Sequence, residues 1–418
     1  MDYLHKWLSK RRFPYEPLIS VEISKGRLIH NLNEFKKLAP EGQIAPVLKS
    51  NAYGHGLIEV ARILEENQHK LNPKTSIFAH EKRMPFFVVD SYFEAIALRA
   101  KKVKTPILVI GFTRPETIAA ARLKDVSFAI TSMDILRLFK KIPPESENSE
   151  LGMISIGALA DAIKRPRRIH IKIDTGMRRQ GISVDDVSET IEIFKSNTGL
   201  VLEGLCSHFS DADNTDESFT EKQILLWNKA VQTFRSAFPN IKYLHLSNTD
   251  GHHFYHDIEA NISRLGIGLY GISSNVTLNK KLNILPVMEM KTIITGMRKL
   301  QAGETVGYSN TFKATKDMKI ATIPVGYFEG LDRRLSNQGT ILVGTNRIAC
   351  PIVGRVSMNI TVIDVSKLNN VAIGTPVTVI SSNPDDPNSI ANISKLCGVI
   401  SYESAIRIST HLKRVIVD

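Results

Sequence analysis

Short apolar runs alternate with amphipathic stretches from about residue 17 to about residue 275. This alternation is the pattern of repeated strand and helix units around a parallel sheet. Apolar residues at 57, 60, 61 and 64 have the i, i+3, i+4, i+7 spacing of an amphipathic helix. Eight such units predict a (β/α)8 TIM barrel. The candidate strands are Ile44–Leu48, Phe86–Val89, Ile107–Ile110, Val126–Ile130, Ile169–Ile173, Leu202–Cys206, Tyr243–Leu246 and Ile262–Arg264. Pro46 argues against the first of them, since proline cannot donate to a sheet ladder.

The pattern changes near residue 278 to shorter runs rich in Val, Ile and Thr, separated by Gly, Asn and Pro. The runs are KTIITGM, KIATIPVGY, GTILVGTNRIACPIVGRVSMNITVIDVS and TPVTVIS. They predict a second, mostly antiparallel β domain. We therefore divide the chain into an N-terminal extension (1–16), a barrel (17–275) and a C-terminal β domain (276–418). Leu4, Trp7 and Leu8 of the extension have helical spacing, which fits an amphipathic segment or a frayed tail, and residues 143–150 are expected to be a polar loop.

Composition narrows the class of protein. Hydrophobic residues make up 43% and charged residues 23% of the chain, which is typical of a globular protein. No apolar run approaches the roughly 18 residues of a membrane span, and the first residues lack the apolar core of a signal peptide, so we expect a cytoplasmic protein. Three cysteines without a CxxC pair fit reduced core thiols. The formal charge of +12 suits anionic ligands, but the basic residues are scattered, so we expect no nucleic-acid partner.

Polar residues follow the predicted strands at the carboxyl ends, where barrels of this kind carry their reactive groups. Lys49 ends the first run, and later runs end in HIKIDTGMRRQG, LEGLCSHFSDADN, HLSNTDG and SRLGIGLYG. A lysine at such a strand end can be desolvated, which lowers its pKa and makes it a nucleophile toward a carbonyl. The ordinary alternative is an exposed loop lysine.

These motifs, with KSNAYGHG around Lys49, resemble those of the alanine racemases, pyridoxal-phosphate enzymes of fold type III. The second domain adds GETVGYSNTF, IPVGYFEGLDRRLSNQG, PIVGRVSMN and ISYE. The resemblance runs from about residue 18 to the C-terminus in the expected order. It implies pyridoxal 5'-phosphate as cofactor, alanine as small-molecule substrate, and a homodimer with shared active sites.

By this resemblance Lys49 is the Schiff-base lysine and the base on one face of the substrate. Tyr308 of the neighbouring subunit would be the base on the other face. A phenol is a poor base at neutral pH, so its phenolate needs donors nearby; His208 matches its partner, with Arg264 behind. Arg264 would also donate to the pyridine nitrogen, which stays unprotonated because a guanidinium keeps its proton. A core histidine and a surface ion pair are the ordinary alternatives for these two residues.

The resemblance also assigns the remaining contacts. Arg179 would contact the phenolic oxygen of the cofactor or the substrate carboxylate, oriented by Lys172 if that lysine is carbamylated. Met358 would offer its backbone N–H to the substrate carboxylate from across the dimer interface. Loops after strands seven and eight often hold phosphate in such barrels. The other implied cofactor-binding residues are Tyr53, Asn248, Thr249, Gly266, Ile267 and Tyr402.

Four positions depart from the family pattern: Thr249 for serine, Arg178 for glycine, and Glu329 and Asn359, each for aspartate. The last two fall in the expected entrance region, with Tyr327 and Arg333, and bear on the range of substrates. The histidine-rich stretch DGHHFYHD lacks an HExxH or CxxC pattern. We therefore expect no metal there and predict a polar helix start, with Asp250 favourable at its N-terminus.

The sequence thus predicts a pyridoxal-phosphate-dependent racemase that interconverts L-alanine and D-alanine by a two-base mechanism and supplies D-alanine for peptidoglycan. A broad-specificity amino-acid racemase is the first alternative, which Asn359 leaves open. A decarboxylase of diamino acids fits Tyr308 and Arg264 poorly. A pyridoxal-phosphate-binding protein without turnover would not need the β domain that carries Tyr308.

Overall fold

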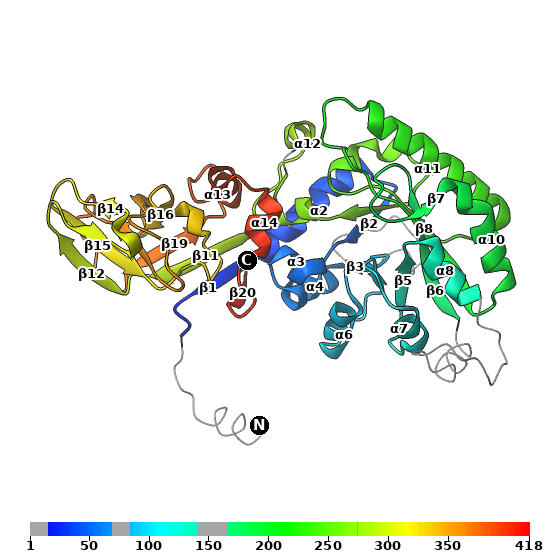
Figure 1. The fold of residues 1–418 in the computed structure, drawn as a ribbon, viewed down its shortest axis with the longest axis horizontal. Coiled ribbons are helices and arrows are strands. Elements are labelled where there is room, and N and C mark those ends of the chain that lie inside the picture. The colour runs from blue at the N-terminus through cyan, green and yellow to red at the C-terminus, as the bar shows by residue number, and fades with distance from the viewer. Residues whose placement is uncertain (1–15, 69–83, 141–165, 274) are drawn as a thin grey trace, which may run out of the picture. The chain divides into compact units, whose positions relative to one another are not determined.

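The computed structural model describes residues 16–68, 84–140, 166–273 and 275–418 (Figure 1). The chain divides into two compact units. One is Ser24–Val287 with Asp418, and the other is Met1–Ile23 with Met288–Val417. The predicted boundaries at 16/17 and 275/276 stay predictions. The expected amphipathic extension, except for residue 16, and the expected loop at 143–150 lie outside the described residues.

Parallel strands and helices alternate along the first unit and form a barrel (Figure 1). Six strands pair in the order β3-β4-β5-β6-β8-β9, and β10 pairs with β2. The ring is closed by a bond from the Asn261 N–H to the Leu244 carbonyl and by a bridge between Val47 and Val88. The strands are β2 (Gln43–Pro46), β3 (Phe87–Val89), β4 (Ile107–Val109), β5 (Val126–Ile130), β6 (Arg167–Asp174), β8 (Leu200–Cys206), β9 (Tyr243–His245) and β10 (Ile262–Leu265). All eight predicted strands and the predicted barrel are confirmed.

The strands form where short apolar runs can be buried on both faces. Every residue of β3, β4 and β5 is buried, as expected for a parallel sheet covered by helices. Pro46 is accommodated in β2 because successive N–H groups along a strand point to opposite neighbouring strands. The Val47 N–H bonds to Leu265 of β10 and the Leu48 N–H bonds to Val88 on the other side. The missing N–H of Pro46 therefore faces β3, to which Leu48 donates the next hydrogen bond on that side, and costs no bond to β10.

Amphipathic helices connect the strands. Helix α4 buries Leu57, Val60, Ala61 and Leu64, which confirms the predicted stripe. Helix α6 begins with a capping box between Ser91 and Glu94. The connecting helices are α2 (Lys25–Leu38), α4 (Leu57–Glu66), α6 (Tyr92–Ala100), α7 (Pro115–Ala120), α8 (Met133–Lys140), α10 (Val187–Ser196) and α11 (Ser218–Ala237). In the described part of the chain, no helix is long and apolar enough to cross a membrane.

The second unit is built mainly from antiparallel strands, as predicted. A six-stranded sheet has the order β17-β16-β19-β11-β1-β20, a second sheet the order β12-β15-β18, and β13 and β14 form a hairpin. The strands are β1 (Ser20–Ser24), β11 (Met288–Ile293), β12 (Gly296–Leu300), β13 (Thr305–Val306), β14 (Phe312–Lys313), β15 (Met318–Ile323), β16 (Thr340–Val343), β17 (Ile348–Pro351), β18 (Thr361–Asp364), β19 (Pro376–Ile380) and β20 (Lys413–Val417). Strand β1 thus precedes the barrel strands in the chain but pairs with β11. The three cysteines are free and buried, which confirms the prediction of core thiols.

Candidate active site

Lys49 stands where β2 ends and begins the short helix α3 (Lys49–Tyr53). Its side chain is partly buried. Burial lowers the pKa of Lys49; Asp90 opposes this effect, whereas the charges of Arg179 and Arg264 lower the pKa further. A larger fraction of the lysine is therefore a neutral amine near pH 7, which is the form that attacks a carbonyl.

The turn that follows Lys49 is left-handed. Residues Ser50 to Tyr53 have φ between 52° and 56°, a conformation that costs about 1–2 kcal/mol for each residue other than glycine. The surroundings must therefore hold it. The Glu94 carboxylate accepts the Ser50 N–H at 2.7 Å, and the Asn51 side chain accepts the Leu57 N–H at 2.8 Å. The turn fixes Lys49 and Tyr53 at the carboxyl end of β2.

Glu94 is a residue that the sequence analysis missed. Its carboxylate supports two elements at once, since it accepts N–H groups from Asp90 and Ser91 at the start of α6 as well as from Ser50. The S-x-x-E spacing of Ser91 and Glu94 could have identified the helix start. It gives no sign of the contact to Ser50, which lies 44 residues away in the chain.

Tyr53, Thr249 and Gly266 come together after β2, β9 and β10. The Thr249 hydroxyl accepts the N–H groups of Gly266 and Gly268, each at 3.2 Å. A Cβ at Gly266 would lie 2.8 Å from the Tyr53 hydroxyl, so only glycine leaves room beside it. Ile267 follows at the start of a 3-10 helix, η5 (Ile267–Tyr270). Hydroxyls and N–H groups around a bare backbone suit a phosphate.

Arg264 is buried on β10 and makes five hydrogen bonds, all through Nη1 and Nη2. Nη2 donates to His208 Nδ1 at 3.1 Å, and Nη1 donates to His245 Nδ1 at 2.7 Å. Burial, followed by the charge of Arg264, lowers the pKa of His208 well below 6.5. His208 is therefore neutral at pH 7 with Nδ1 accepting, which places its proton on Nε2. The structure thus brings His208 and Arg264 together, as predicted.

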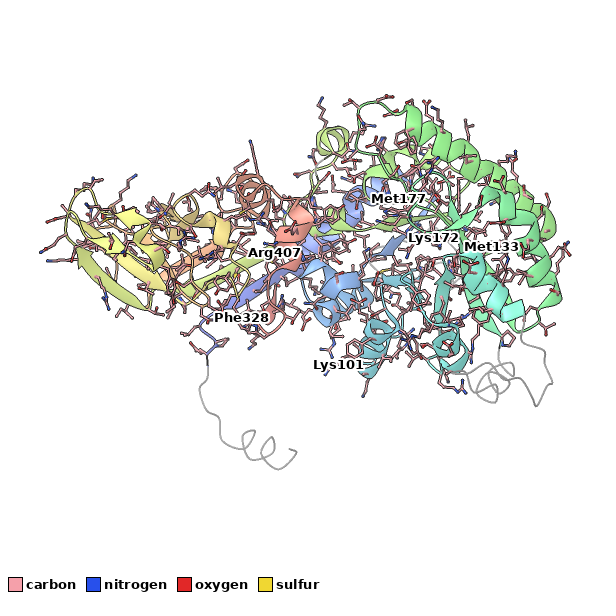
Figure 2. All side chains as sticks on the ribbon, in the orientation of Figure 1. Lys101, Met133, Lys172, Met177, Phe328 and Arg407 are labelled. Atoms are coloured by element: carbon pink, nitrogen blue, oxygen red, sulfur yellow. The ribbon has the colours of Figure 1, made fainter. Side chains whose placement is uncertain are left out.

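Lys172 lies on β6 (Figure 2) and donates from Nζ to the Gln180 side chain at 3.1 Å. Burial lowers its pKa; Cys206 opposes this, and Arg264, Arg179 and Lys49 add to it. Arg179 itself is exposed on the segment after β6. Whether Lys172 carries a carbamate that orients Arg179 stays a prediction.

Four cations therefore act on one another at this end of the barrel: Lys49, Lys172, Arg179 and Arg264. Among carboxylates, Asp90 and Glu94 oppose them at Lys49, and Glu94 is already bound by backbone N–H groups. Such an excess of positive charge, with Arg264 buried and Lys49 and Lys172 partly buried, favours a polyanionic ligand. These groups together fit pyridoxal phosphate. The Lys49 amine can react with its aldehyde, and the backbone at Gly266 with the hydroxyls of Tyr53 and Thr249 can bind its phosphate. The described hydrogen bonds of Arg264 do not use Nε, which can donate to its ring nitrogen.

Tyr308, Met358 and Tyr402 lie in the other unit, so their approach to the barrel residues stays a prediction. Tyr308 begins a 3-10 turn, η6 (Tyr308–Asn310), directly after Gly307, whose φ is 77°. Tyr308 is 68% exposed and Met358 is 55% exposed. Tyr402 lies in helix α14 (Ser401–Ile406). Two of the three side chains are thus open to another molecule.

Glu329 and Asn359, two of the departures from the family pattern, contact each other. The Asn359 amide donates to the Glu329 carboxylate at 2.7 Å, and the Gly326 N–H donates to it at 2.8 Å. Glu329 is only 4% exposed. The Phe328 N–H also bonds to the Met358 carbonyl at 2.9 Å. The pair therefore holds the loop that carries Met358, a structural task that sequence alone did not indicate.

The histidine-rich stretch forms the predicted helix start, a 3-10 helix η4 (Asp250–Asp257) after β9. Asn248 supports it by accepting the Gly251 N–H at 2.8 Å. The prediction that a charged Asp250 is favourable there is wrong, because burial, followed by Asp213, raises its pKa to about 6. In the described ranges no three His, Cys, Asp or Glu side chains are grouped to hold a metal.

Two domain families match this chain. The one described as alanine racemase, N-terminal domain, matches residues 23–72 and 74–274, and the one described as alanine racemase, C-terminal domain, matches residues 287–416. An alanine racemase of Lactobacillus acidophilus is 32% identical over 409 residues, covering 96% of this chain and 98% of that protein. An alanine racemase of Fusobacterium nucleatum is 34% identical over 405 residues, covering 95% and 99%.

Solved structures agree. The alanine racemase of Clostridium difficile 630 superposes with a TM-score of 0.81 at 26% identity and covers 96% of each chain. The alanine racemase of Bacillus anthracis with bound L-Ala-P gives a TM-score of 0.79 at 26% identity, over 97% of this chain and 96% of that one.

Proposed function

Because the chain belongs to the alanine racemase family, we propose that it is a pyridoxal-phosphate-dependent racemase that interconverts L-alanine and D-alanine. The observation that carries the proposal is the cluster at the carboxyl ends of the barrel strands. It combines Lys49, whose pKa is lowered, with the glycine cradle beside Tyr53 and the buried guanidinium of Arg264. A cytoplasmic location and the supply of D-alanine for peptidoglycan belong to the same proposal.

Bound pyridoxal phosphate supplies an aldehyde and a conjugated ring that make the Cα–H bond of an attached amino acid acidic. The chain itself must hold the phosphate and move the proton. Tyr53, Thr249 and the backbone at Gly266 and Ile267 would bind the phosphate, with Asn248 supporting the turn and Tyr402 added from the second unit. Arg179 would face the phenolic oxygen or the substrate carboxylate.

Lys49 would take or return the proton on one face of Cα. A base must be neutral before it can accept a proton, and the lowered pKa of Lys49 gives it a larger neutral fraction. The excess of cations around Nζ favours release of the proton again. The same environment therefore serves both directions of a reversible reaction.

Arg264 and His208 would control the charge of two groups, the ring nitrogen of the cofactor and the second base, Tyr308, on the other face of Cα. Arg264 keeps its proton at any working pH, so it stabilises a lone pair on the ring nitrogen without protonating it. His208 has a hydrogen bond from Arg264 on Nδ1, which leaves the Nε2 proton to donate to a phenolate. This is the donor that a Tyr308 phenolate needs in order to act as a base.

Tyr308 and Met358 would come from a second copy of the chain, which makes the proposed enzyme a homodimer with shared sites. Their high exposure within their own unit supports this, since a side chain left open in one chain is free to complete the site of another. An isolated monomer is then expected to be inactive.

The test uses purified protein with pyridoxal phosphate and single L-amino acids in deuterium oxide, with optical inversion and Cα exchange as readouts. Inversion with exchange of alanine alone supports the proposal. Inversion of lysine or arginine as well selects the broad-specificity racemase. This alternative is tested because Glu329 and Asn359, which depart from the family pattern, contact each other near Met358. Cofactor absorbance without exchange of any amino acid would show a binding protein and overturn it.

A further inference from the structure

A column of polar side chains crosses the interior of the barrel below Arg264. Barrel interiors of this type are filled mainly by branched apolar side chains, so these groups require a reason. His245 on β9 and His170 on β6 are both 0% exposed, and Glu203 on β8 has a side chain that is 11% exposed. Phe86 packs against both imidazoles, which keeps water away from them.

The direction of each hydrogen bond in this column follows from chemistry. Arg264 can only donate, so His245 Nδ1, which is 2.7 Å from Nη1, must accept. A neutral His245 then has its proton on Nε2 and donates to His170 Nδ1 at 2.8 Å. His170 in turn has its proton on Nε2, which lies 3.4 Å from Glu203 Oε2, a close contact between imidazole and carboxylate in which the N–H is not aligned for a hydrogen bond. Burial lowers the pKa of both imidazoles, in agreement with this neutral state.

Two local features of β8 build the column. The pairing of β6 with β8 shifts between Ile169 and His170, so that Ile169 faces Leu202 and His170 faces Gly204. Glu203 is therefore the extra residue of a bulge, and bulges commonly redirect a side chain near a functional site. Gly204 has no side chain where a Cβ would lie 2.7 Å from His170 Nδ1. Because Gly204 has no side chain, the imidazoles of His170 on β6 and His245 on β9 can meet across β8.

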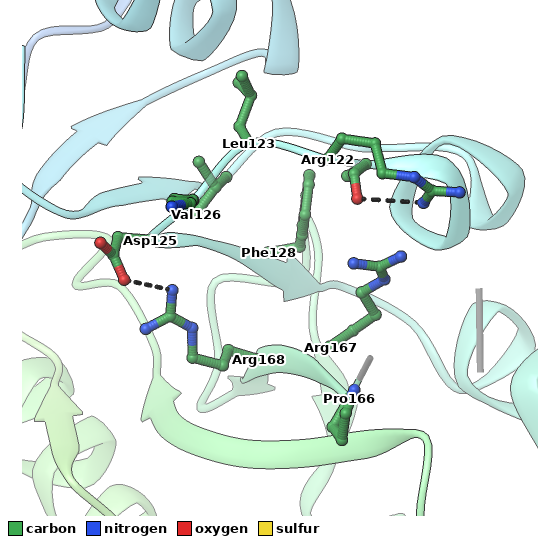
Figure 3. A pocket seen from close by; sticks show the side chains of 10 residues that line it. Arg122, Leu123, Asp125, Val126, Phe128, Pro166, Arg167 and Arg168 are labelled. Atoms are coloured by element: carbon green, nitrogen blue, oxygen red, sulfur yellow. Dashed lines mark hydrogen bonds and ion pairs between the residues drawn. The ribbon is translucent and has the colours of Figure 1, made fainter. Parts of the chain in front are cut away.

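The far end of the column is anchored by charge. Arg168 lies 3.7 Å from Glu203 and 3.1 Å from Asp125, in a pocket of about 250 Å³ (Figure 3). The Ser127 hydroxyl also donates to Glu203. Burial would raise the pKa of Glu203, but its contacts with His170, Ser127 and Arg168 lower it overall, so the carboxylate is ionised at neutral pH.

We infer that Glu203 is a positioning residue for the proposed reaction: through His170 and His245 it fixes the guanidinium of Arg264, so that Nε remains the donor for the ring of the cofactor. The inference rests on the proposed function through Arg264. An acceptor at position 203 locks His170 in one tautomer, and His170 locks His245. Without that acceptor both imidazoles can reverse, and His245 can present an N–H to Arg264 instead of a lone pair.

The test compares Glu203→Leu, which has no acceptor, with Glu203→Gln, which keeps one in Oε1. Glu259→Gln is the matched control, because Glu259 pairs with Arg235 at 2.6 Å between partly exposed side chains. The readouts on the full-length holoenzyme are the downfield imidazole N–H proton resonances, kcat and KM for alanine, and thermal unfolding. The affinity of the cofactor-free protein for pyridoxal phosphate is measured as well.

For Glu203→Leu we expect loss of the His170 N–H resonance and a kcat about 10- to 100-fold lower, with the KM for alanine changed less than about threefold. Glu203→Gln and Glu259→Gln should keep the resonance and a kcat within about threefold of the wild type. A normal kcat in any folded Glu203 variant that has lost the resonance overturns the inference, as does a kcat loss in Glu203→Leu with all resonances retained. If Glu203→Leu does not fold, Glu203→Gln still decides: it supports the inference if resonance and kcat are both kept or both lost.

A wild-type protein that does not racemise alanine would overturn the proposed function instead. The resonances and the cofactor affinity would then still report whether the column exists and whether it supports Arg264.

Discussion

The clearest electrostatic prediction concerns Asp250, which directly follows Thr249. Burial is the main cause that raises its pKa from 3.8 to about 6, and Asp213 adds to it. The folded chain therefore binds this proton more tightly than the unfolded chain, and between about pH 4 and pH 6 it holds more protons. Stability that is present below pH 4 is lost as the pH rises through 6. The shift of about two units corresponds to about 3 kcal/mol in total.

Replacing Asp250 by Asn removes this titration and leaves a neutral amide of the same shape. From the two pKa values, about half of the effect accumulates below pH 5. The free energy of unfolding of Asp250→Asn relative to the wild type should therefore increase by about 1.5 kcal/mol between pH 5 and pH 8. Any constant effect of the substitution cancels in this difference. Urea unfolding at a fixed excess of pyridoxal phosphate measures it, because bound cofactor also stabilises the folded state.

Asp257→Asn is the control, since Asp257 is exposed at the other end of the same 3-10 helix and its replacement removes the same charge. Asp213→Asn should reduce the pH dependence in the wild-type background, because Asp213 contributes to the shift. Parallel stability curves for Asp250→Asn and the wild type across this range would refute the argument.

Further predictions concern the site itself. Lys49→Ala should lose the imine absorbance of the cofactor, whereas the exposed Lys101→Ala should keep it, and absorbance retained in Lys49→Ala would contradict the assignment. Tyr308→Phe should keep the absorbance and lose deuterium uptake on one face of Cα, as measured by mass spectrometry in deuterium oxide; symmetrical loss would contradict the two-base division. Gly266→Ala should weaken pyridoxal-phosphate binding at least about tenfold, since the new Cβ lies 2.8 Å from the Tyr53 hydroxyl, while Gly296→Ala, with contacts no closer than 3.8 Å, should not. Asn359→Asp should place a second carboxylate beside buried Glu329 and lower stability by about 1–3 kcal/mol, and Glu329→Gln in the same chain should restore it in thermal unfolding.

The sequence predicts the barrel well because a buried parallel strand has a local signature. A run such as VSFAI (126–130) is apolar enough to be buried on both faces, and β5 has the predicted bounds. Lys49, His208 and Arg264 could also be found, because each lies at a strand end within a short motif. For these elements the signal is local, because the apolar run and the polar residue that follows or ends it are close together in the chain.

The rest depends on contacts between distant segments, which no local pattern encodes. The left-handed turn after Lys49 contains Ser, Asn, Ala and Tyr, of which only asparagine is commonly found in that conformation; its support comes from Glu94. In LEGLC the alternation of side chains would turn Glu203 and Gly204 to opposite faces, yet the bulge directs both toward His170. The same alternation gives no reason for a charge inside the barrel. Its reason appears only when β6, β9 and β10 are placed beside β8, because a guanidinium that must donate fixes two imidazoles in sequence and requires an acceptor at the end of them.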